Sequence, residues 1–302
     1  MKRVALALLV LVAAAFPATA RAADVAASSG SLTMTSDPGD WVGQGMSYSL
    51  ATPDETFFTH GDATYYDGNM VRVRVDGPGQ SWYLGFQAPT GQTLTPGVMY
   101  ANAIRGLQSS PPPGPLPRMD VSGNGRGCNT VSGSFTVLGA KYGPYGYLEG
   151  FHVTFEQHCE GAVPALRGEL EVVVPPGPTA QSVHVTIDPA GVAARPSGAA
   201  VVHGTISCAL PFTAYLTVVV NQDTKKGQAS GTAWSVEAPC SGPSGSAWSA
   251  SVPPDSRAFV AGDAQVQVTT RTVDDYYTQY LGQNPIFVDA AESATVQLRL
   301  PH

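Results

Sequence analysis

The stretch that decides the fold is residues 151–159, which read FHVTFEQHC. Apolar residues occupy its odd positions, interrupted only by Gln157, and polar residues occupy its even positions. An alternation with a period of two is typical of a strand with one buried and one solvated face. The turn signal GPYG at 143–146 separates this stretch from the β-rich residues 134–138, so the sequence predicts a hairpin. A third strand is expected at 165–171.

The pairing of the two hairpin strands has one weakness. If Tyr142 lies opposite Tyr147, then Phe135 and Val137 point away from the core. We therefore expect either a β-bulge near Gly139 or a second layer of structure that covers that face.

The polar residues of the same stretch form a stripe along one face of the strand. His152 and His158 lie about 20 Å apart on an extended chain, too far to share a metal ion. Glu156 and His158 lie about 7 Å apart, close enough to share one. The preferred interpretation is an outer face in contact with water, as in other sheets with one wet side.

The rest of the chain reads as short strands between turn residues. In the first half they are expected at 31–35, 46–50, 56–60, 70–76, 81–87 and 98–101, and in the second half at 182–187, 200–208, 214–222, 228–237, 247–252, 264–272 and 294–300. Strands of this length and spacing predict an all-β fold with two β-sandwich domains. The first, residues 23–174, is expected to be jelly-roll-like and the second, residues 180–302, immunoglobulin-like. The proline-rich linker 175–179 separates them, and we expect each domain to fold on its own.

Residues 1–22 have the pattern of a signal peptide. Lys2 and Arg3 precede the apolar run 4–15, and small residues suitable for cleavage follow. No later segment is apolar enough to span a membrane as a helix, so the sequence predicts a secreted protein. The formal charge is −7, and loss of Lys2, Arg3 and Arg21 with the leader takes it to −10. An acidic chain is a poor partner for nucleic acid or an anionic membrane.

Four cysteines in an exported chain predict two disulfides. Their division across the linker favours Cys128–Cys159 and Cys208–Cys240. Each disulfide would close a loop of about 32 residues, worth roughly 3.7 kcal/mol in the chain-entropy model. In the hairpin register above, Cys128 lies on a diagonal of about 7–8 Å from Cys159, and a bend at the glycines of 123–127 would close the gap. Zinc is the weaker alternative, because no Cys-x-x-Cys pair is present.

Three motifs carry a resemblance to a known kind of module. They are SDPGDWVG at 36–43, DVSGNGRGCN at 120–129 and FEQHCEG at 155–161. Through them, residues 30–172 resemble an uncharacterised module of exported bacterial proteins that often accompanies immunoglobulin-like or other β domains. The second domain, around 204–208 and Cys240, more loosely resembles small secreted β-sandwich domains of actinobacteria. Neither resemblance implies an activity or a catalytic residue.

The sequence contains few signals for chemistry. It has no Gly-x-Ser-x-Gly, no His-Glu-x-x-His and no phosphate-binding Gly-Lys loop. No cofactor is expected other than calcium, because residues 22–71 combine many acidic side chains with only Arg21 and Arg72 as flanking bases. Asp37 and Asp40 are the candidate ligands. The alternative is that both are ordinary turn residues.

Aromatic residues are the other candidates for binding. Trp41, Tyr65, Tyr66, Trp82 and Tyr83 would suit stacking against sugars, although burial is the usual fate of such rings.

Three further tyrosines, Tyr276, Tyr277 and Tyr280, fall in the long insertion 274–289 and are the better candidates for an exposed ligand surface. The alternative is that they cover a sandwich edge. We predict a non-catalytic binding protein for an extracellular polysaccharide or a cell-surface protein. The alternatives are an enzyme acting on an extracellular polymer and a structural spacer, and the oligomeric state stays open.

Overall fold

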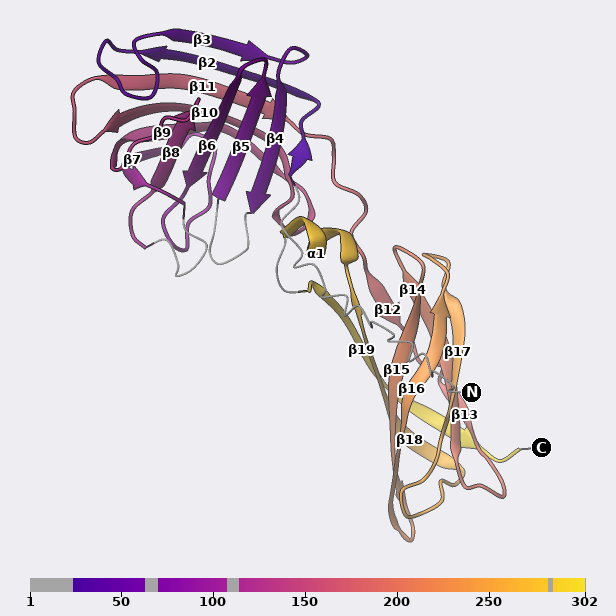
Figure 1. The fold of residues 1–302 in the computed structure, drawn as a ribbon. Helices are drawn as coiled ribbons and strands as arrows, with labels where there is room; N and C mark the ends of the chain where they lie inside the picture. The colour runs from indigo at the N-terminus through magenta and orange to yellow at the C-terminus, as the bar shows by residue number, and fades with distance from the viewer. Residues whose placement is uncertain (1–23, 63–69, 108–113, 282–284, 302) are drawn as a thin grey trace, which may run out of the picture.

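The computed structural model describes residues 24–62, 70–107, 114–281 and 285–301. The expected signal peptide, residues 1–22, lies outside this part of the chain. The described chain is nearly all β and forms two sheets of the β-sandwich type, one in each half (Figure 1). The predicted fold class is confirmed, whereas the finer descriptions, jelly-roll-like and immunoglobulin-like, remain predictions.

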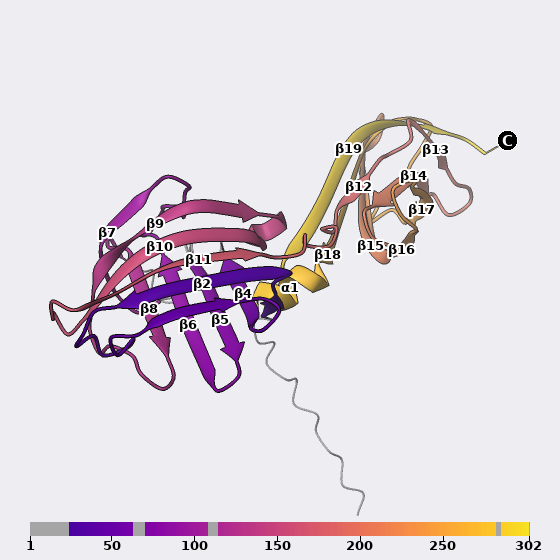
Figure 2. The ribbon, with the colours of Figure 1, turned by 90° about the horizontal axis from the view of Figure 1, so that it is seen from above.

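The first domain is one eleven-stranded sheet with the order β1-β4-β5-β6-β8-β7-β9-β10-β11-β2-β3. Its strands are β1 (Val25–Ala26), β2 (Ser29–Ser36), β3 (Ser47–Ala51), β4 (Thr56–Asp62), β5 (Met70–Gly77), β6 (Gln80–Gln87), β7 (Met99–Arg105), β8 (Arg118–Gly123), β9 (Val131–Tyr142), β10 (Leu148–Cys159) and β11 (Ala165–Val173). The short 3-10 helix η2 (Pro144–Gly146) joins β9 to β10. Seen from above, the layer of β9, β10, β11 and β2 lies over the layer of β4, β5, β6 and β8 (Figure 2).

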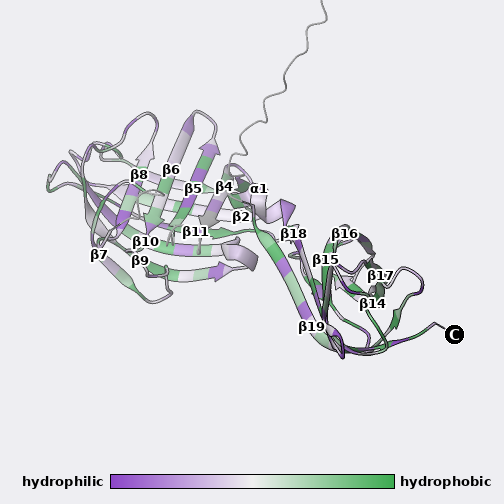
Figure 3. Cartoon of the chain, turned by 90° about the horizontal axis from the view of Figure 1, so that it is seen from below, coloured by the Kyte–Doolittle hydropathy of each residue, from purple (hydrophilic) through white to green (hydrophobic). Residues whose placement is uncertain are grey.

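Aromatic side chains fill the space between these two layers. The ring centroid of Phe86 on β6 lies 5.2–5.9 Å from those of Phe135, Phe151 and Phe155 on β9 and β10. These rings and Trp82 are almost completely buried. Apolar and polar residues alternate along the strands, as Figure 3 shows, so that one face of each strand joins the core and the other faces outward.

The β9–β10 hairpin contains the expected bulge. Gly139 pairs with His152, but Val137 pairs with Val153, so Leu138 is the extra residue and its side chain is exposed. The bulge turns Phe135 and Val137 into the core. The register with Tyr142 opposite Tyr147 is wrong, because Tyr142 pairs with Leu148.

Gln157, the polar interruption in the predicted strand, is buried for a specific reason. Its side-chain amide donates a hydrogen bond to the carbonyl of Val121 and accepts one from the amide of the same residue, each 2.8 Å long. A buried amide that makes both bonds avoids the cost of an unsatisfied polar group. The contact ties β10 to β8 across the core.

The second domain is an eight-stranded sheet with the order β12-β14-β13-β19-β18-β15-β16, in which β17 also pairs with β14. Its elements are β12 (Val183–Val185), β13 (Ala190–Ala193), β14 (Ala200–Cys208), β15 (Phe212–Thr224), β16 (Gly227–Cys240), β17 (Ser246–Val252), β18 (Gly262–Val273), α1 (Asp275–Leu281) and β19 (Phe287–Arg299). Trp248 and the aliphatic residues of β14, β15 and β18 form its core.

Both predicted disulfides are present. Cys128 and Cys159 are joined in the first domain with an Sγ–Sγ distance of 2.02 Å, and Cys208 and Cys240 in the second with 1.99 Å. Each disulfide lies within one domain and belongs to that domain's own core cluster.

The long β18–β19 hairpin reaches from the second domain toward the first and carries α1 at its tip (Figure 1). There a third apolar cluster forms from Tyr147 and Val174 of the first domain and Tyr277, Tyr280 and Leu281 of the tip. We call these five residues the junction cluster.

The linker is held by this cluster through hydrogen bonds. The hydroxyl of Tyr277 donates to the carbonyl of Pro178 (2.6 Å), and that of Tyr147 donates to the carbonyl of Pro175 (3.2 Å). The carboxylate of Asp274 accepts a bond from the amide of Gln181 (2.7 Å). Residues 175–179 are therefore anchored on both sides, and separate folding of the two domains remains a prediction.

Candidate ligand groove

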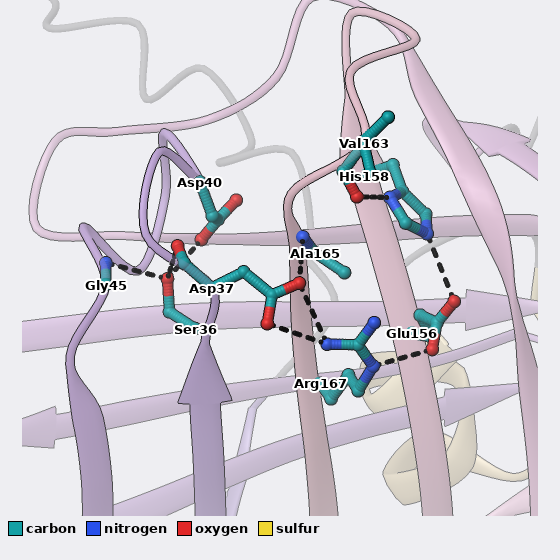
Figure 4. A network of polar contacts seen from close by, with 9 residues as sticks. All are labelled: Ser36, Asp37, Asp40, Gly45, Glu156, His158, Val163, Ala165 and Arg167. Atoms are coloured by element: carbon teal, nitrogen blue, oxygen red, sulfur yellow. Dashed lines mark hydrogen bonds and ion pairs between the residues drawn. The ribbon is translucent and has the colours of Figure 1, made fainter.

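The two proposed calcium ligands have structural partners. Both carboxylate oxygens of Asp37 bind the guanidinium of Arg167, at 3.0 and 3.1 Å, and one also accepts the amide hydrogen of Ala165 (Figure 4). The bond from Ala165, and then those from Arg167, lower the pKa of the Asp37 carboxyl. Asp40 is buried, and its Oδ2 accepts bonds from the Gly43 amide and the Ser36 hydroxyl. Asp37 thus pairs with a charged residue and Asp40 stabilises a turn, and calcium binding at these residues stays a prediction.

The polar stripe of β10 and β11 is a chain of paired charges. Glu156 accepts bonds from His158 (3.1 Å) and from Arg167 (2.7 Å), and Arg167 continues to Asp37 (Figure 4). The bond from His158, followed by that from Arg167, lowers the pKa of Glu156. Among the described residues, no group of three or more His, Cys, Asp or Glu side chains gathers where a metal ion could bind.

The three tyrosines of the predicted insertion do not form an exposed loop surface. They belong to α1, where Tyr277 is fully buried and Tyr280 is 2% exposed in the junction cluster. The hydroxyl of Tyr280 accepts a bond from the amide of Leu148 (3.3 Å). Tyr276 is 43% exposed, so it is the ring of the three that a ligand can reach. Residues 275–281 form a helix whose tyrosines pack against Tyr147 of the first domain.

Strand alternation separates two of the other aromatic candidates, Trp82 and Tyr83. Trp82 lies in the core, whereas its neighbour Tyr83 is 54% exposed on the outer face of β6. Trp41 is exposed in a turn. Tyr65 and Tyr66 lie outside the described residues.

Tyr83 lies in a hollow on the described part of the first domain. This hollow has a volume of about 700 Å³ and lies over the outer face of β4, β5, β6 and β8. A smaller hollow of about 290 Å³ adjoins it and shares Tyr83, Asp120 and Ser122. We call the two hollows together the groove.

The floor of the groove follows from the strand register. One row of paired residues crosses the four strands as Phe58, Arg74, Tyr83 and Ser122, and a second as His60, Arg72, Gly85 and Asp120. Residues between these rows, such as Val73 and Leu84, are buried in the core. Both rows therefore point outward, and at about 4.8 Å per strand each row spans roughly 14 Å.

Gly85 lets the side chain of Leu107 approach the strand closely. A methyl group added at Gly85 would collide with the side chain of Leu107, which follows β7 and lies over the glycine. Leu107 also lines the hollow, so it supplies an apolar patch next to the ring of Tyr83. Glycine in a strand often marks such a close approach.

Charged side chains line the groove around Tyr83. Arg74 lies 4.4 Å over the ring of Phe58 and forms ion pairs with Asp24 (3.3 Å) and Asp76 (3.0 Å). Arg105 is 3.8 Å from Asp120, a longer pair. Burial raises the pKa of the Asp120 carboxyl, an effect that Arg105 opposes. A carboxyl group with a raised pKa in a hollow is a common mark of a functional site.

The groove does not assemble a catalytic triad. Ser122 and Asp120 lie two residues apart on β8, while His60 lies three strands away on β4, at roughly 14 Å. The ring of His60 packs against Tyr280 of α1, 5.2 Å between centroids. The edge of the groove thus meets the junction cluster.

Sequence reasoning named Tyr83 but missed its partners in the groove. The alternation of residues 71–75 indicated that Arg72 and Arg74 share one face of a strand. The neighbouring strand at 118–123, however, was not recognised from the sequence. Without β8, Asp120 and Ser122 had no place beside Tyr83.

Comparison of the chain with protein family models, curated proteins and solved structures finds no match. The resemblance of residues 30–172 to an exported bacterial module therefore stays a prediction. In the part of the chain that the structure describes, no helix has the length and apolar character needed to cross a membrane.

Proposed function

We propose that this is an exported, non-catalytic binding protein that holds a saccharide chain in the groove. The observation that carries the proposal is the half-exposed ring of Tyr83 in the middle of the hollow. A sugar ring packs its C–H face on an aromatic ring, while its hydroxyl groups need donors and acceptors nearby. Arg74, Asp120 and Ser122 provide such groups around Tyr83.

The position of the carboxylates favours binding over hydrolysis. Asp24 and Asp120 both line the groove, but they lie at opposite ends, with Asp24 just before β1 at one edge and Asp120 on β8. Four strand spacings separate their backbones, roughly 19 Å at about 4.8 Å each, which is more than two aspartate side chains can span to the glycosidase distance. Glycosidases place their two carboxyl groups about 5–9.5 Å apart. The pair is too widely spaced for either glycosidase mechanism.

Export is supported by the two disulfides, because such bonds persist in oxidising compartments. The predicted signal peptide agrees with this. An extracellular polysaccharide is thus a ligand that the protein would meet where its disulfides are stable.

A glycan array probed with the mature protein tests the proposal. We expect retention of specific glycans, and Tyr83→Ala should weaken the binding of a retained glycan about tenfold, as expected for a lost ring contact. The matched control is Tyr215→Ala, because Tyr215 on β15 is 60% exposed but lies in the second domain.

Equal binding by wild-type protein and Tyr83→Ala would reject the groove as the site. Release of reducing ends from a retained glycan would show catalysis and reject a purely binding role. Failure to retain any glycan would reject the saccharide as the ligand.

A further inference from the structure

The basic residues of the first domain are distributed unevenly. Residues 24–174 contain fourteen acidic residues but only seven basic ones. Five of these seven are arginines on or beside the groove, namely Arg72, Arg74, Arg105, Arg118 and Arg126. The other two, Lys141 and Arg167, lie on β9 and β11. An acidic domain has thus collected most of its positive charge at one surface.

The smaller hollow carries more positive than negative charge among the described residues. It is lined by Arg105 and Arg126, with Asp120 as its one described acidic residue. In the larger hollow, Arg74 is already paired with Asp24 and Asp76. The smaller hollow therefore has a positive balance within a negative domain. Low-dielectric walls strengthen such a local field and favour entry of negative groups.

Two of these arginines, Arg74 and Arg126, are already oriented, and a third, Arg105, is held more loosely. Arg74 is fixed by two aspartates and by the ring of Phe58. The Nε of Arg126 donates a hydrogen bond to the backbone carbonyl of Val42 (2.9 Å). This bond orients the guanidinium, and its acceptor is an uncharged carbonyl rather than a carboxylate. Arg105 is half-exposed and only loosely paired with Asp120. Because a guanidinium presents a planar fork of donors, arginines held in this way suit carboxylate and sulfate groups.

From this charge arrangement we infer that the groove binds an acidic saccharide, one whose sugar carries a carboxylate or sulfate group. This inference rests on the proposed function and adds the chemical class of the ligand. The sugar ring packs on Tyr83, and its anionic group lies toward Arg105 and Arg126, which line the smaller hollow beside that ring.

Titration calorimetry with matched polymers tests the inference. Polygalacturonate is compared with its fully methyl-esterified form, and dextran sulfate with dextran, so that each pair differs in charge on one backbone. We expect the charged member of at least one pair to bind about tenfold or more tightly than its neutral form. Binding of polygalacturonate identifies a carboxylate ligand and binding of dextran sulfate identifies a sulfate ligand, and either supports the inference.

A charge variant locates the effect in the groove. Arg105→Gln should weaken binding of the charged polymer about tenfold, because a charge-assisted hydrogen bond is lost. Arg271→Gln is the matched control, since Arg271 is similarly exposed and pairs with Asp289 in the second domain. It should leave binding unchanged.

Four outcomes overturn the inference. One is equal affinity for the charged and neutral polymers, and another is equal affinity of wild-type protein and Arg105→Gln for the charged polymer. In the third, a neutral polymer alone is bound and Tyr83→Ala weakens it, so the proposed function survives while the acidic ligand does not. If neither charged nor neutral polymers nor any glycan of the array bind, the proposed function fails together with the inference.

Discussion

Tyrosines occupy two contrasting places in this protein, the groove and the junction cluster. Tyr83 projects from the outer face of a strand and keeps 54% of its surface exposed, whereas Tyr277 is completely buried. The ring of Tyr277 packs edge-on against Tyr147, and its hydroxyl bonds to the linker. The same residue type therefore offers a surface to a ligand in one place and joins two domains in the other.

The difference shows that local sequence polarity is a poor guide to exposure. Tyr276, Tyr277 and Tyr280 lie among Asp, Thr and Gln residues, which suggested a loop. Tyr83 follows a tryptophan in a strongly apolar strand, which suggested burial. Exposure is decided by the strand period around Tyr83 and by the contact of α1 with the first domain.

The largest expected difference between the two regions is in the free energy of unfolding of tyrosine variants. Tyr277→Ala should lower the free energy of unfolding by about 3 kcal/mol, because a buried ring leaves a cavity and a hydrogen bond is lost. Tyr276→Ala and Tyr83→Ala, at exposed rings, should change it by less than about 1 kcal/mol. Urea denaturation of the three variants measures the differences. Equal losses for Tyr277→Ala and Tyr83→Ala would mean that the two regions do not differ as described.

The junction should also be sensitive to alkaline pH. Burial, followed by the charge of Asp274, raises the pKa of Tyr277 from 10.0 to about 12. A phenol with a raised folded-state pKa contributes stability that is present below pH 10 and lost as the pH rises through about 12. Tyr277→Phe should therefore show a smaller fall in melting temperature between pH 10 and pH 12 than wild-type protein. Identical falls would contradict a buried, neutral Tyr277.

Carboxyl groups on the two outer faces of the first domain, Glu156 and Asp120, should affect the stability of the protein in opposite directions as the pH falls. The pKa of Glu156 in the stripe is lowered by His158 and Arg167, so its stabilisation is present above about pH 4.5 and lost below it. The pKa of Asp120 is raised by burial, so its charged form is unfavourable above its usual pKa. At pH 7, Glu156→Gln should lower the melting temperature and Asp120→Asn should raise it, and both differences should shrink near pH 3. Shifts of the same sign would contradict this assignment.

The smallest expected effect concerns calcium. Because both oxygens of Asp37 are occupied by Arg167, millimolar calcium should leave the melting temperature of the protein unchanged relative to chelator. Arg167→Gln frees these oxygens and is the variant in which a calcium shift would first appear. A clear rise in the wild-type melting temperature would restore the calcium site at Asp37 and Asp40.

Much of the fold follows from the sequence because strand alternation is a local property. The period of two located β5, β6, β10 and β14 closely, and the division of cysteines across the linker gave both disulfides. The bulge near Gly139 was predictable because Phe135 and Val137 needed burial.

Three strands were missed for physical reasons. Strand β8 has only Met119 and Val121 as apolar residues between polar ones, and β1 and β13 are very short. Strand β19 begins at Phe287 because its first half pairs with β18 in the long β18–β19 hairpin, although residues 289–293 bring few apolar side chains. These strands depend on partners distant in sequence, and so does the groove, whose rows cross four strands.

The measurement that tests the central claim most directly is the affinity of a groove-filling variant for a retained glycan. Ser122 lies opposite Tyr83 in the register and points into the hollow, so Ser122→Trp should fill the site and weaken binding at least tenfold without lowering the melting temperature. The matched control is Thr217→Trp on the outer face of β15, which should bind like wild-type protein. Equal dissociation constants for Ser122→Trp, Thr217→Trp and wild-type protein would contradict the groove as the binding site.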